Sequence, residues 1–188
     1  MDIQLHTDEQ LMVAIAQGCM AEFGELVTRH QEKVFFLALR TLGQWDMAED
    51  ISQEAFLRVY HAANSYHPHA KFTTWLYRIV VNLCLDQKRK TKRAYTAISE
   101  QAEQLESNTE GDPANILQVK ENKQVVWKAM EKLSKRERIV VVLHRFHGLS
   151  HAEVADTTGW SLSAVESLMV RSYRKLREEL KKFGDFEK

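Results

Sequence analysis

The sequence contains few residues that interrupt helices. Its 188 residues include only two prolines and seven glycines, and strand-like alternation of hydrophobic and polar residues is missing. The run Ile139–Leu143 is the only one rich in β-branched residues, and it lies between helical signals. Scarce glycine and proline favour long helices joined by short loops. The sequence therefore predicts an all-α protein.

Cysteines and long apolar runs are scarce as well. Cys19 and Cys84 are far apart and fit no metal-ligand spacing, so we expect two free thiols in a reducing cytoplasm and no metal or cofactor. The first ten residues, MDIQLHTDEQ, are polar and acidic, unlike a signal peptide. No hydrophobic run approaches a membrane span. We expect a cytoplasmic protein with no direct membrane insertion.

The overall charge hides an uneven distribution. The 26 basic residues balance 26 acidic ones, and residues 1–93 are balanced by themselves. Residues 94–113 hold five acidic residues and no basic one, whereas residues 114–188 hold 15 basic and ten acidic residues. The excess of five positive charges in the last part suits contact with nucleic acid.

A helix-turn-helix is predicted in the stretch GLSHAEVADTTGWSLSAVESLMVRSYRKL, which begins at Gly148. Ser150 and Glu153 have the spacing of a capping box, and Gly159 is a typical helix stop. Either of two serines can cap the second helix, Ser161 or Ser163. Its inner face is expected to hold Val165, Met169, Ser172 and Leu176. The outer face is small, polar and basic, which suits a DNA major groove, although a hairpin with a solvated outer face is the alternative.

Further helices are expected over residues 8–17, 21–42, 45–63, 72–93, 113–133 and 135–147. Asp46 is expected to cap the third of them, and Ser134 with Glu137 has the spacing of a capping box at the start of the last. The inward-facing residues are expected to include Tyr60, Trp75, Val126 and Phe146. The acidic, polar residues 94–112 cannot bury enough apolar surface to order themselves, so they predict a flexible linker.

Two of the expected helices have polar faces that invite a functional interpretation. The helix over 45–63 turns Asp50, Gln53, Glu54, Leu57 and His61 outward, and a solvated acidic face is the alternative. The helix over 72–93 carries a basic face that follows a loop with aromatic residues. Such an arrangement can hold a phosphate backbone and stack unpaired bases, but a solvated helix end with favourable C-terminal cations would look the same.

Three blocks together resemble a known family. DMAEDISQEAFLRVY, FTTWLYRIVVNLCLDQKRK and LSKRERIVVVLHRFHGLSHAEVADTTG…SAVESLMVRSYRKLR are similar, in order and spacing, to extracytoplasmic-function sigma factors of the sigma-70 family. The resemblance runs from about Asp8 to Leu180. It implies a stress-response promoter-specificity subunit of bacterial RNA polymerase, with no catalysis of its own. It further implies a region 2 helical bundle over residues 1–93, the linker, and a region 4 helix-turn-helix domain over residues 113–188.

The resemblance also implies which residues bind each partner. The clamp helices of the largest polymerase subunit would meet Asp46, Glu49, Asp50, Gln53, Glu54 and Leu57. The minus-ten promoter element would meet Tyr66, His67, His69, Lys71, Arg78, Asn82 and Arg89. The minus-thirty-five element would meet His144, Ser163, Glu166, Ser167, Val170, Arg171, Arg174 and Lys175. Other implied partners are the flap of the second-largest subunit and a membrane-associated anti-sigma factor.

The chain departs from the family pattern at two positions of the recognition helix. Glu166 and Leu168 stand where the family often has basic residues, which predicts weaker phosphate anchoring. Glu166 can instead accept a hydrogen bond from a cytosine amino group.

Two other functions are considered. A helix-turn-helix activator with an N-terminal helical sensor domain explains the last part of the chain but not the polar face within residues 45–63. A metal-dependent enzyme could use His61, His67, His69 and Cys84, but these residues have no recognised ligand spacing and no accompanying carboxylate pair.

Overall fold

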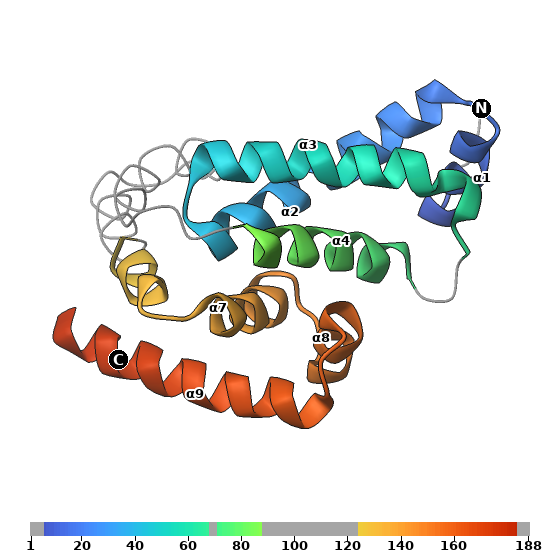
Figure 1. Ribbon diagram of the computed structural model, residues 1–188. Coiled ribbons are helices and arrows are strands. Elements are labelled where there is room, and N and C mark those ends of the chain that lie inside the picture. Colours follow the sequence, from blue (N-terminus) through green and yellow to red (C-terminus); the bar gives the residue numbers. More distant parts are fainter. Residues whose placement is uncertain (1–5, 68–70, 88–123, 184–188) are drawn as a thin grey trace.

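The computed structural model describes residues 6–67, 71–87 and 124–183. All regular elements within these ranges are helical (Figure 1), which confirms the all-α class. The predicted linker, the basic tail beginning at Lys88 and the first residues of the helix expected over 113–133 lie outside the described residues.

The first helical domain is a bundle in which α3 and α4 pack on α2. Its helices are α1 (Asp8–Ala16), α2 (Met20–Leu42), α3 (Trp45–Ala62) and α4 (Phe72–Asp86), with a 3-10 turn over Ala63–Ser65. Gly43 ends α2 in the left-handed conformation (φ 70°), which glycine adopts without strain. The chain can therefore reverse at once into α3.

Two expectations for α3 are wrong. Its N-cap is Gln44. Asp46 lies inside the first turn, where its negative charge still interacts favourably with the helix dipole. Tyr60 is 39% exposed because it lies at the edge of the bundle, with its ring 5.3 Å from that of Phe23.

The second helical domain begins with a helical segment over residues 124–131. There follow α7 (Lys135–Val141), a π-helical turn (Val142–Phe146), α8 (His151–Thr158) and α9 (Leu162–Leu180), with a final 3-10 turn over Lys181–Phe183. The predicted capping boxes, Ser134 with Glu137 and Ser150 with Glu153, are both confirmed. Ser161, rather than Ser163, caps α9, so the capping box that the spacing of Ser163 and Glu166 predicts does not form.

The helix expected over 135–147 is wrong in its second half. From Val142 the backbone widens into a π-helical turn, in which His147 N donates to Val142 O. The wider turn rotates the residues that follow it, and Phe146 is 45% exposed instead of buried. Val126 is also exposed, at 40%, because the buried part of its helix begins at Ala129.

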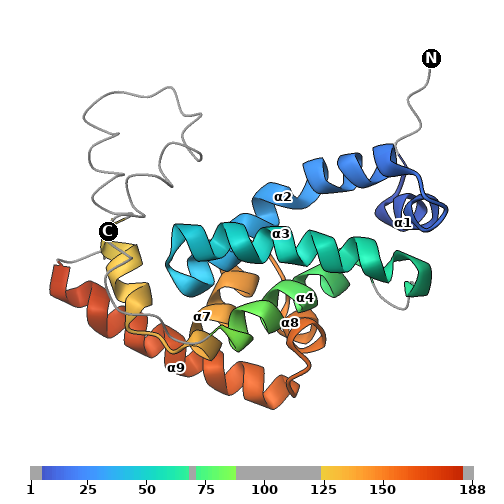
Figure 2. The same cartoon turned by 45° about the horizontal axis from the view of Figure 1, so that its top comes forward.

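The two domains pack directly on each other. Figure 1 shows α7 below α2 and α4, and Figure 2 shows α8 beside α4. Residues of α7 and of the π-helical turn contact α2. One cluster of buried hydrophobic residues continues from α2 and α4 into α7, α8 and α9. The sequence predicted two domains, but not this contact between them.

Candidate functional site

The outward face of α3 is acidic and contains one large apolar residue. Ala48, Ile51, Ala55 and Val59 are buried, which turns the positions between them to solvent. The predicted residues Asp46, Glu49, Asp50, Gln53 and Leu57 are exposed, and Glu54 is partly buried. Leu57 is 52% exposed. A single exposed leucine is common on protein surfaces, so the face is defined by this residue together with its polar neighbours.

The side chains of this α3 face differ in how freely they can meet a partner. Glu49 accepts a hydrogen bond from Trp45 Nε1 (2.9 Å), and Glu54 pairs with Arg58 Nε (2.8 Å). Asp50 and Gln53 have no hydrogen bond or ion pair with any residue that the structure describes.

The candidate minus-ten residues occupy one face of α4 and the chain before it. Lys71, Arg78 and Asn82 are exposed and share that face, as their spacing predicts. His67 is exposed as well. His69 and Arg89 lie outside the described residues.

Tyr66 belongs to an aromatic cluster beside this α4 face. Its ring lies 4.9 Å from the Trp75 ring and 6.1 Å from the Phe72 ring. Burial, together with the charges of Glu9 and Asp8, raises the pKa of the Tyr66 hydroxyl, so the phenol remains neutral. Trp75, which was expected to be buried, is only partly buried, because it lies in the first turn of α4 at the edge of the core.

The second domain already contacts two of these cations. Lys71 Nζ is 3.2 Å from Glu153 Oε1, and the Arg78 guanidinium donates to the carbonyl oxygen of Asp156. Hydrogen bonds from the backbone and side chain of Ser150, and then from Lys71, lower the pKa of Glu153. Its carboxylate is therefore charged at neutral pH. Both acceptors lie on α8, and no sequence signal indicated this pairing.

The outward face of α9 carries most of the candidate minus-thirty-five residues. The exposed ones are Ser163, Glu166, Ser167, Val170, Arg171 and Arg174. Val170 is 71% exposed, and Arg171 Nε donates to the Ser167 carbonyl (3.2 Å). The expected inner face, Val165, Met169 and Ser172, is buried, with Leu176 partly so. The helix therefore presents small side chains, an exposed valine and arginines together.

Three further residues of this region have contacts within the second domain. Lys175 Nζ is 2.8 Å from the buried Glu137 Oε1, and His144 Nδ1 is 2.7 Å from the Leu149 carbonyl oxygen. Leu168 is only 9% exposed. Its departure from the family pattern therefore lies on the inner side of α9, and it does not remove a cation from the outer face.

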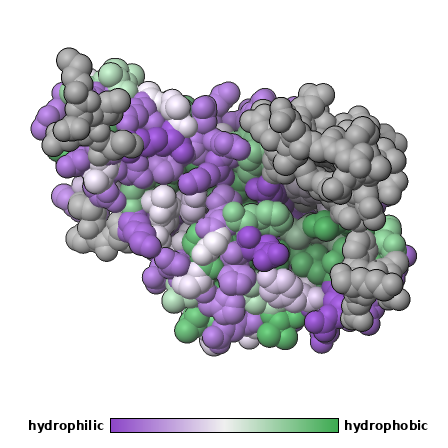
Figure 3. All heavy atoms as spheres, turned by 180° about the vertical axis from the view of Figure 1, so that it is seen from behind, coloured by the Kyte–Doolittle hydropathy of each residue, from purple (hydrophilic) through white to green (hydrophobic). Residues whose placement is uncertain are grey.

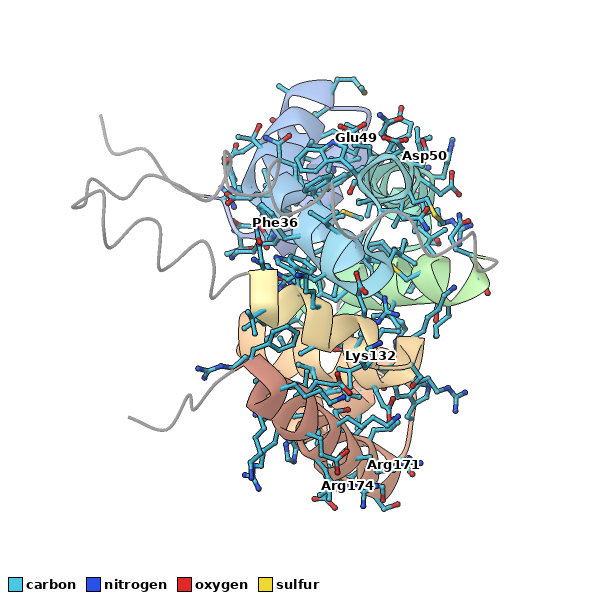
Figure 4. The ribbon with its side chains drawn as sticks, turned by 90° about the vertical axis from the view of Figure 1, so that its left-hand side faces the viewer. Phe36, Glu49, Asp50, Lys132, Arg171 and Arg174 are labelled. Carbon is cyan, nitrogen blue, oxygen red and sulfur yellow. The ribbon has the colours of Figure 1, made fainter. Side chains whose placement is uncertain are left out.

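The α3 and α9 faces lie at opposite ends of the molecule. Figure 4 shows Glu49 and Asp50 at one end and Arg171 and Arg174 at the other, with Phe36 near the junction of the domains. Seen from behind, the edge along which α9 runs mixes hydrophobic and hydrophilic side chains (Figure 3). Leu162 and Tyr173 of α9 are 46% and 42% exposed.

The described residues include no helix that could span a membrane. They also contain no group of three or more histidine, cysteine, aspartate or glutamate residues placed to hold a metal ion.

Comparisons with known proteins agree on one family. Residues 26–94 match the model for sigma-70 region 2, and residues 123–176 match that for sigma-70 region 4. The ECF RNA polymerase sigma-E factor of Escherichia coli K12 is 32% identical over 175 residues, which cover 88% of this chain and 90% of that protein. The ECF RNA polymerase sigma factor SigE of Mycolicibacterium smegmatis is 34% identical over 167 residues, and the match covers 88% of this chain and 64% of that protein.

Two solved structures share the arrangement of helices. CnrH, in complex with the cytosolic domain of CnrY, matches with a TM-score of 0.69 and 27% identity over 94% of this chain and 99% of that one. The sigma factor RpoE in complex with the anti-sigma factor NepR from Bartonella quintana has a TM-score of 0.60 at 18% identity, which shows the fold alone. The two family models and the Escherichia coli relative show that the chain belongs to the extracytoplasmic-function sigma factors, the promoter-specificity subunits of bacterial RNA polymerase.

Proposed function

We propose that this sigma factor uses its three exposed faces for three different partners. The α3 face binds the clamp helices of core RNA polymerase, the α4 face binds the minus-ten element, and the α9 face reads the minus-thirty-five element. The observation that carries the proposal is the placement of these faces on separate helices, each with its opposite side buried in a core. Each face can therefore change in sequence without rebuilding the fold.

The α3 face suits a protein partner because charge and apolar area occur together there. Asp50 and Gln53 are available for hydrogen bonds, and Leu57 supplies an apolar surface that water solvates poorly. Interfaces obtain most of their affinity from a few such central residues. We place core polymerase on this face, with Asp50, Gln53 and Leu57 at its centre.

The α4 face suits a single strand of DNA because cations and an amide lie beside aromatic rings. Opening a promoter pulls bases out of the stack, which costs a few kcal/mol, and the exposed base must be received elsewhere. Asn82 can donate to and accept from a base edge, and Lys71 and Arg78 can hold the flanking phosphates. Tyr66 forms the wall of the base pocket, and the partly exposed Trp75 extends that wall.

The α9 face suits a major groove because small residues allow close approach. Ser163 and Ser167 are small, Val170 can contact a thymine methyl group, and Arg174 can read guanine. Glu166 can accept a hydrogen bond from cytosine. Lys175 pairs with Glu137 of α7, and His144 bonds to the Leu149 carbonyl before α8, so both support the helix-turn-helix from within the domain.

Two further partners complete the proposal. Region 4 contacts the flap of the second-largest polymerase subunit, and an anti-sigma factor silences the protein by covering its exposed apolar residues, among them Leu57 and Val170. CnrH and the Bartonella factor are each solved with another protein bound, and for the latter that protein is an anti-sigma factor. The sigma factor itself catalyses nothing, and it works in the cytoplasm, where core polymerase meets promoter DNA.

Transcription with purified components tests the proposed function. Core polymerase should initiate at a cognate promoter only after this protein is added, and the protein alone should not shift promoter DNA in a gel. Asp50→Ala combined with Gln53→Ala should weaken binding to core polymerase while leaving the melting temperature unchanged, because exposed substitutions rarely exceed about 0.5 kcal/mol. Gln31→Ala, on the exposed side of α2, is the control.

The activator alternative predicts the opposite gel-shift result. An activator binds its operator without polymerase, whereas this proposal requires core polymerase for specific binding. Specific binding by the protein alone, together with unchanged core affinity in the double variant, would exclude the assignment of the α3 face.

A further inference from the structure

The first turn of α1 contacts the part of the chain that carries the α4 face. Helix α1 packs against α2 and against the 3-10 turn over Ala63–Ser65. Figure 1 shows α1 at the end of the first domain where α3 ends and α4 begins. A capping box formed by Thr7 and Gln10 fixes the start of α1. The two acidic residues between them, Asp8 and Glu9, are therefore held in a defined turn.

The Glu9 carboxylate caps a helix other than its own. Its Oε1 accepts a hydrogen bond from the backbone N–H of Phe72 (3.3 Å), the first residue of α4. The first N–H groups of a helix have no partner within the helix, and negative charge there interacts favourably with the helix dipole. Lys71, the N-cap of α4, makes no side-chain cap hydrogen bond, and the first turn of α4 contains no acidic residue. Glu9 therefore supplies from α1 what α4 lacks at its own start.

Asp8 attaches the same turn of α1 to α2. Its Oδ2 lies 2.8 Å from His30 Nε2, and its Oδ1 lies 3.2 Å from Arg29 Nη1. His30 is only 5% exposed, and its ring centroid lies 5.3 Å from that of Phe72. Arg29 also donates to the His6 carbonyl (2.6 Å), just before α1. The acidic turn of α1 is thus bound to α2 and to the first residue of α4 at once.

Tyr66 is the second aromatic residue that this turn approaches. Burial, and then the charges of Glu9 and Asp8, raise the pKa of the Tyr66 hydroxyl. The hydroxyl oxygen is buried and has no hydrogen-bond partner among the described residues, so packing holds the ring in place. One of its ring neighbours is Trp75, at 4.9 Å, in the first turn of α4. The geometry of this aromatic pair therefore depends on how the start of α4 is held.

We propose that Glu9 and Asp8 are positioning residues for minus-ten recognition. Neither residue belongs to the α4 face. Glu9 holds the first turn of α4, and Asp8 holds the turn that carries Glu9. The inference rests on the function proposed above for the α4 face, and it adds α1 to the parts of the chain that determine promoter choice.

Loss of the Glu9 contact should loosen only the start of α4. Helix ends fray first, because their terminal groups have few partners. Lys71 and Trp75 lie in or next to the first turn. Asn82 lies ten residues after Phe72, about 15 Å further along the helix at about 1.5 Å per residue. A variant at Glu9 should therefore still transcribe, but with weaker discrimination at the position whose base the pocket receives.

A promoter library transcribed by reconstituted holoenzyme tests the proposal. Each sigma variant is combined with core polymerase, and sequencing of the transcripts gives the base preference at every minus-ten and minus-thirty-five position. Glu9→Ala should lower discrimination at one minus-ten position about threefold, within the range expected for a lost helix cap. Its minus-thirty-five preference should not change. Asp8→Ala should shift the same position in the same direction, because it releases the turn that carries Glu9.

Two further variants separate positioning from a loss of stability. Glu9→Gln retains a side-chain oxygen that can accept from the Phe72 N–H, so it should keep most of the wild-type preference. Glu22→Ala removes a carboxylate from the first turn of α2, where it has no hydrogen bond or ion pair with any described residue. It should change no base preference, whatever its effect on the melting temperature. Circular dichroism establishes that each variant is folded at the assay temperature.

The outcomes distinguish this inference from the proposed function. Asn82→Ala, on the α4 face itself, should change the minus-ten preference. If it does and Glu9→Ala does not, the first turn of α1 has no part in recognition. An equal loss at all promoter sequences in Glu9→Ala, or equal impairment of Glu9→Gln, would also overturn the positioning role.

Two results remain to be assigned. Wild-type preference in Asp8→Ala, next to a changed preference in Glu9→Ala, would overturn the role of Asp8. If Asn82→Ala leaves the minus-ten preference unchanged, the function proposed for the α4 face fails, and the inference about α1 fails with it.

Discussion

The two cysteines of the chain have opposite environments. Cys19 is exposed beside α2, whereas Cys84 is buried in α4, where burial raises the pKa of its thiol to about 12. Only the thiolate reacts readily with disulfide reagents. We predict that the native protein releases one equivalent of thionitrobenzoate rapidly at pH 8 and a second only in denaturant. Two rapid equivalents without denaturant would contradict the packing of α4.

The two arginines on the outer face of α9 should have different effects on promoter choice. Arg171 is held against the Ser167 carbonyl, whereas Arg174 has no hydrogen bond or ion pair with any described residue. Arg174→Ala should cost about 1–3 kcal/mol of promoter-binding free energy and relax the sequence preference at one base pair of the minus-thirty-five element, as expected for a base contact. Arg171→Ala should weaken binding to all promoter sequences alike, as expected for a phosphate contact.

A promoter library transcribed by each variant measures this difference. Arg177→Ala, near the end of the helix, is the matched control and should preserve both activity and preference. If Arg174→Ala keeps the wild-type preference at every minus-thirty-five position, this arginine does not read a base.

Single residues were predictable where the signal is local. The serine–glutamate spacing predicted both capping boxes because each involves residues only three positions apart. Lys175 shows the limit of such reasoning. Its partner, Glu137, lies 38 positions away on another helix, and the periodicity of α9 carries no information about that helix.

At the scale of the element, Glu137 ties two helices of region 4 together. Burial disfavours its charge, but hydrogen bonds from Lys175 and Ser134 outweigh burial and lower the pKa of its carboxyl. A carboxyl with a lowered pKa in the folded state stabilises the fold above its ordinary pKa of about 4.5. That stability is lost as the pH falls through the lower, folded pKa.

Glu137→Gln tests the strength of this pair. Glutamine can keep the capping-box geometry but loses the ion pair with Lys175, so we expect a loss of about 1–3 kcal/mol at pH 7 in urea unfolding. The variant should also lose less stability than the wild type on acidification below pH 4.5. Glu166→Gln, on an exposed site of the same domain, should stay within about 0.5 kcal/mol of the wild type. Equal stability of Glu137→Gln and wild type would show that the pair contributes nothing.

Helix existence followed from hydrophobic periodicity, but the π-helical turn did not. The spacing within residues 135–147 fits an ordinary helix, and an inserted π-helical turn leaves the same apolar residues in the sequence. The π-helical turn changes the direction in which the side chains at its end point. Phe146 and His147 face the junction with region 2, where they contact Arg40 and Tyr77.

At the scale of the whole molecule, the packing of the domains was beyond sequence reasoning. Lys135 and Arg138 bind backbone carbonyls, and every residue has a carbonyl, so no side-chain pattern marks the acceptors. The positive charge of the last part of the chain predicted contact with DNA. Part of that charge instead faces the helix ends of region 2.

The junction between the two domains contains a histidine that should make the contact between them dependent on pH. His147 lines a cavity of about 290 Å³ together with Glu32, Lys33, Phe36, Arg40, Tyr77 and Phe146. Burial, and then the charges of Arg40 and Lys33, lower the pKa of His147 to about 4. Glu32 is the one acidic group among these lining residues. An open chain would return the histidine to water and to a pKa of about 6.5.

We call the form with the two domains in contact closed and the form with separated domains open. Between pH 6.5 and pH 4 the open form binds more protons than the closed form, so acid favours opening. With these two pKa values, the free energy that favours the closed form over the open form falls by about 2 kcal/mol at pH 5. The ratio of closed to open molecules then falls roughly thirtyfold.

Cys19 is exposed and Cys84 is buried, so a pair of dyes can be placed on Cys19 and on Glu178→Cys, at an exposed site of α9. Energy transfer between these dyes should fall as the pH is lowered from 7 to 5. This window lies above the range in which Glu137 titrates, so loss of the Glu137–Lys175 pair does not contribute to the change.

His147→Gln should make energy transfer nearly independent of pH over this window, because glutamine does not titrate. His61→Gln, on the exposed side of α3, should keep the wild-type response. A pH response that survives in His147→Gln would assign it to another group. A flat wild-type profile would mean that His147 is as easily protonated in the closed form as in water. In that case the junction admits water freely, and its aromatic and cationic contacts do not exclude solvent from the imidazole.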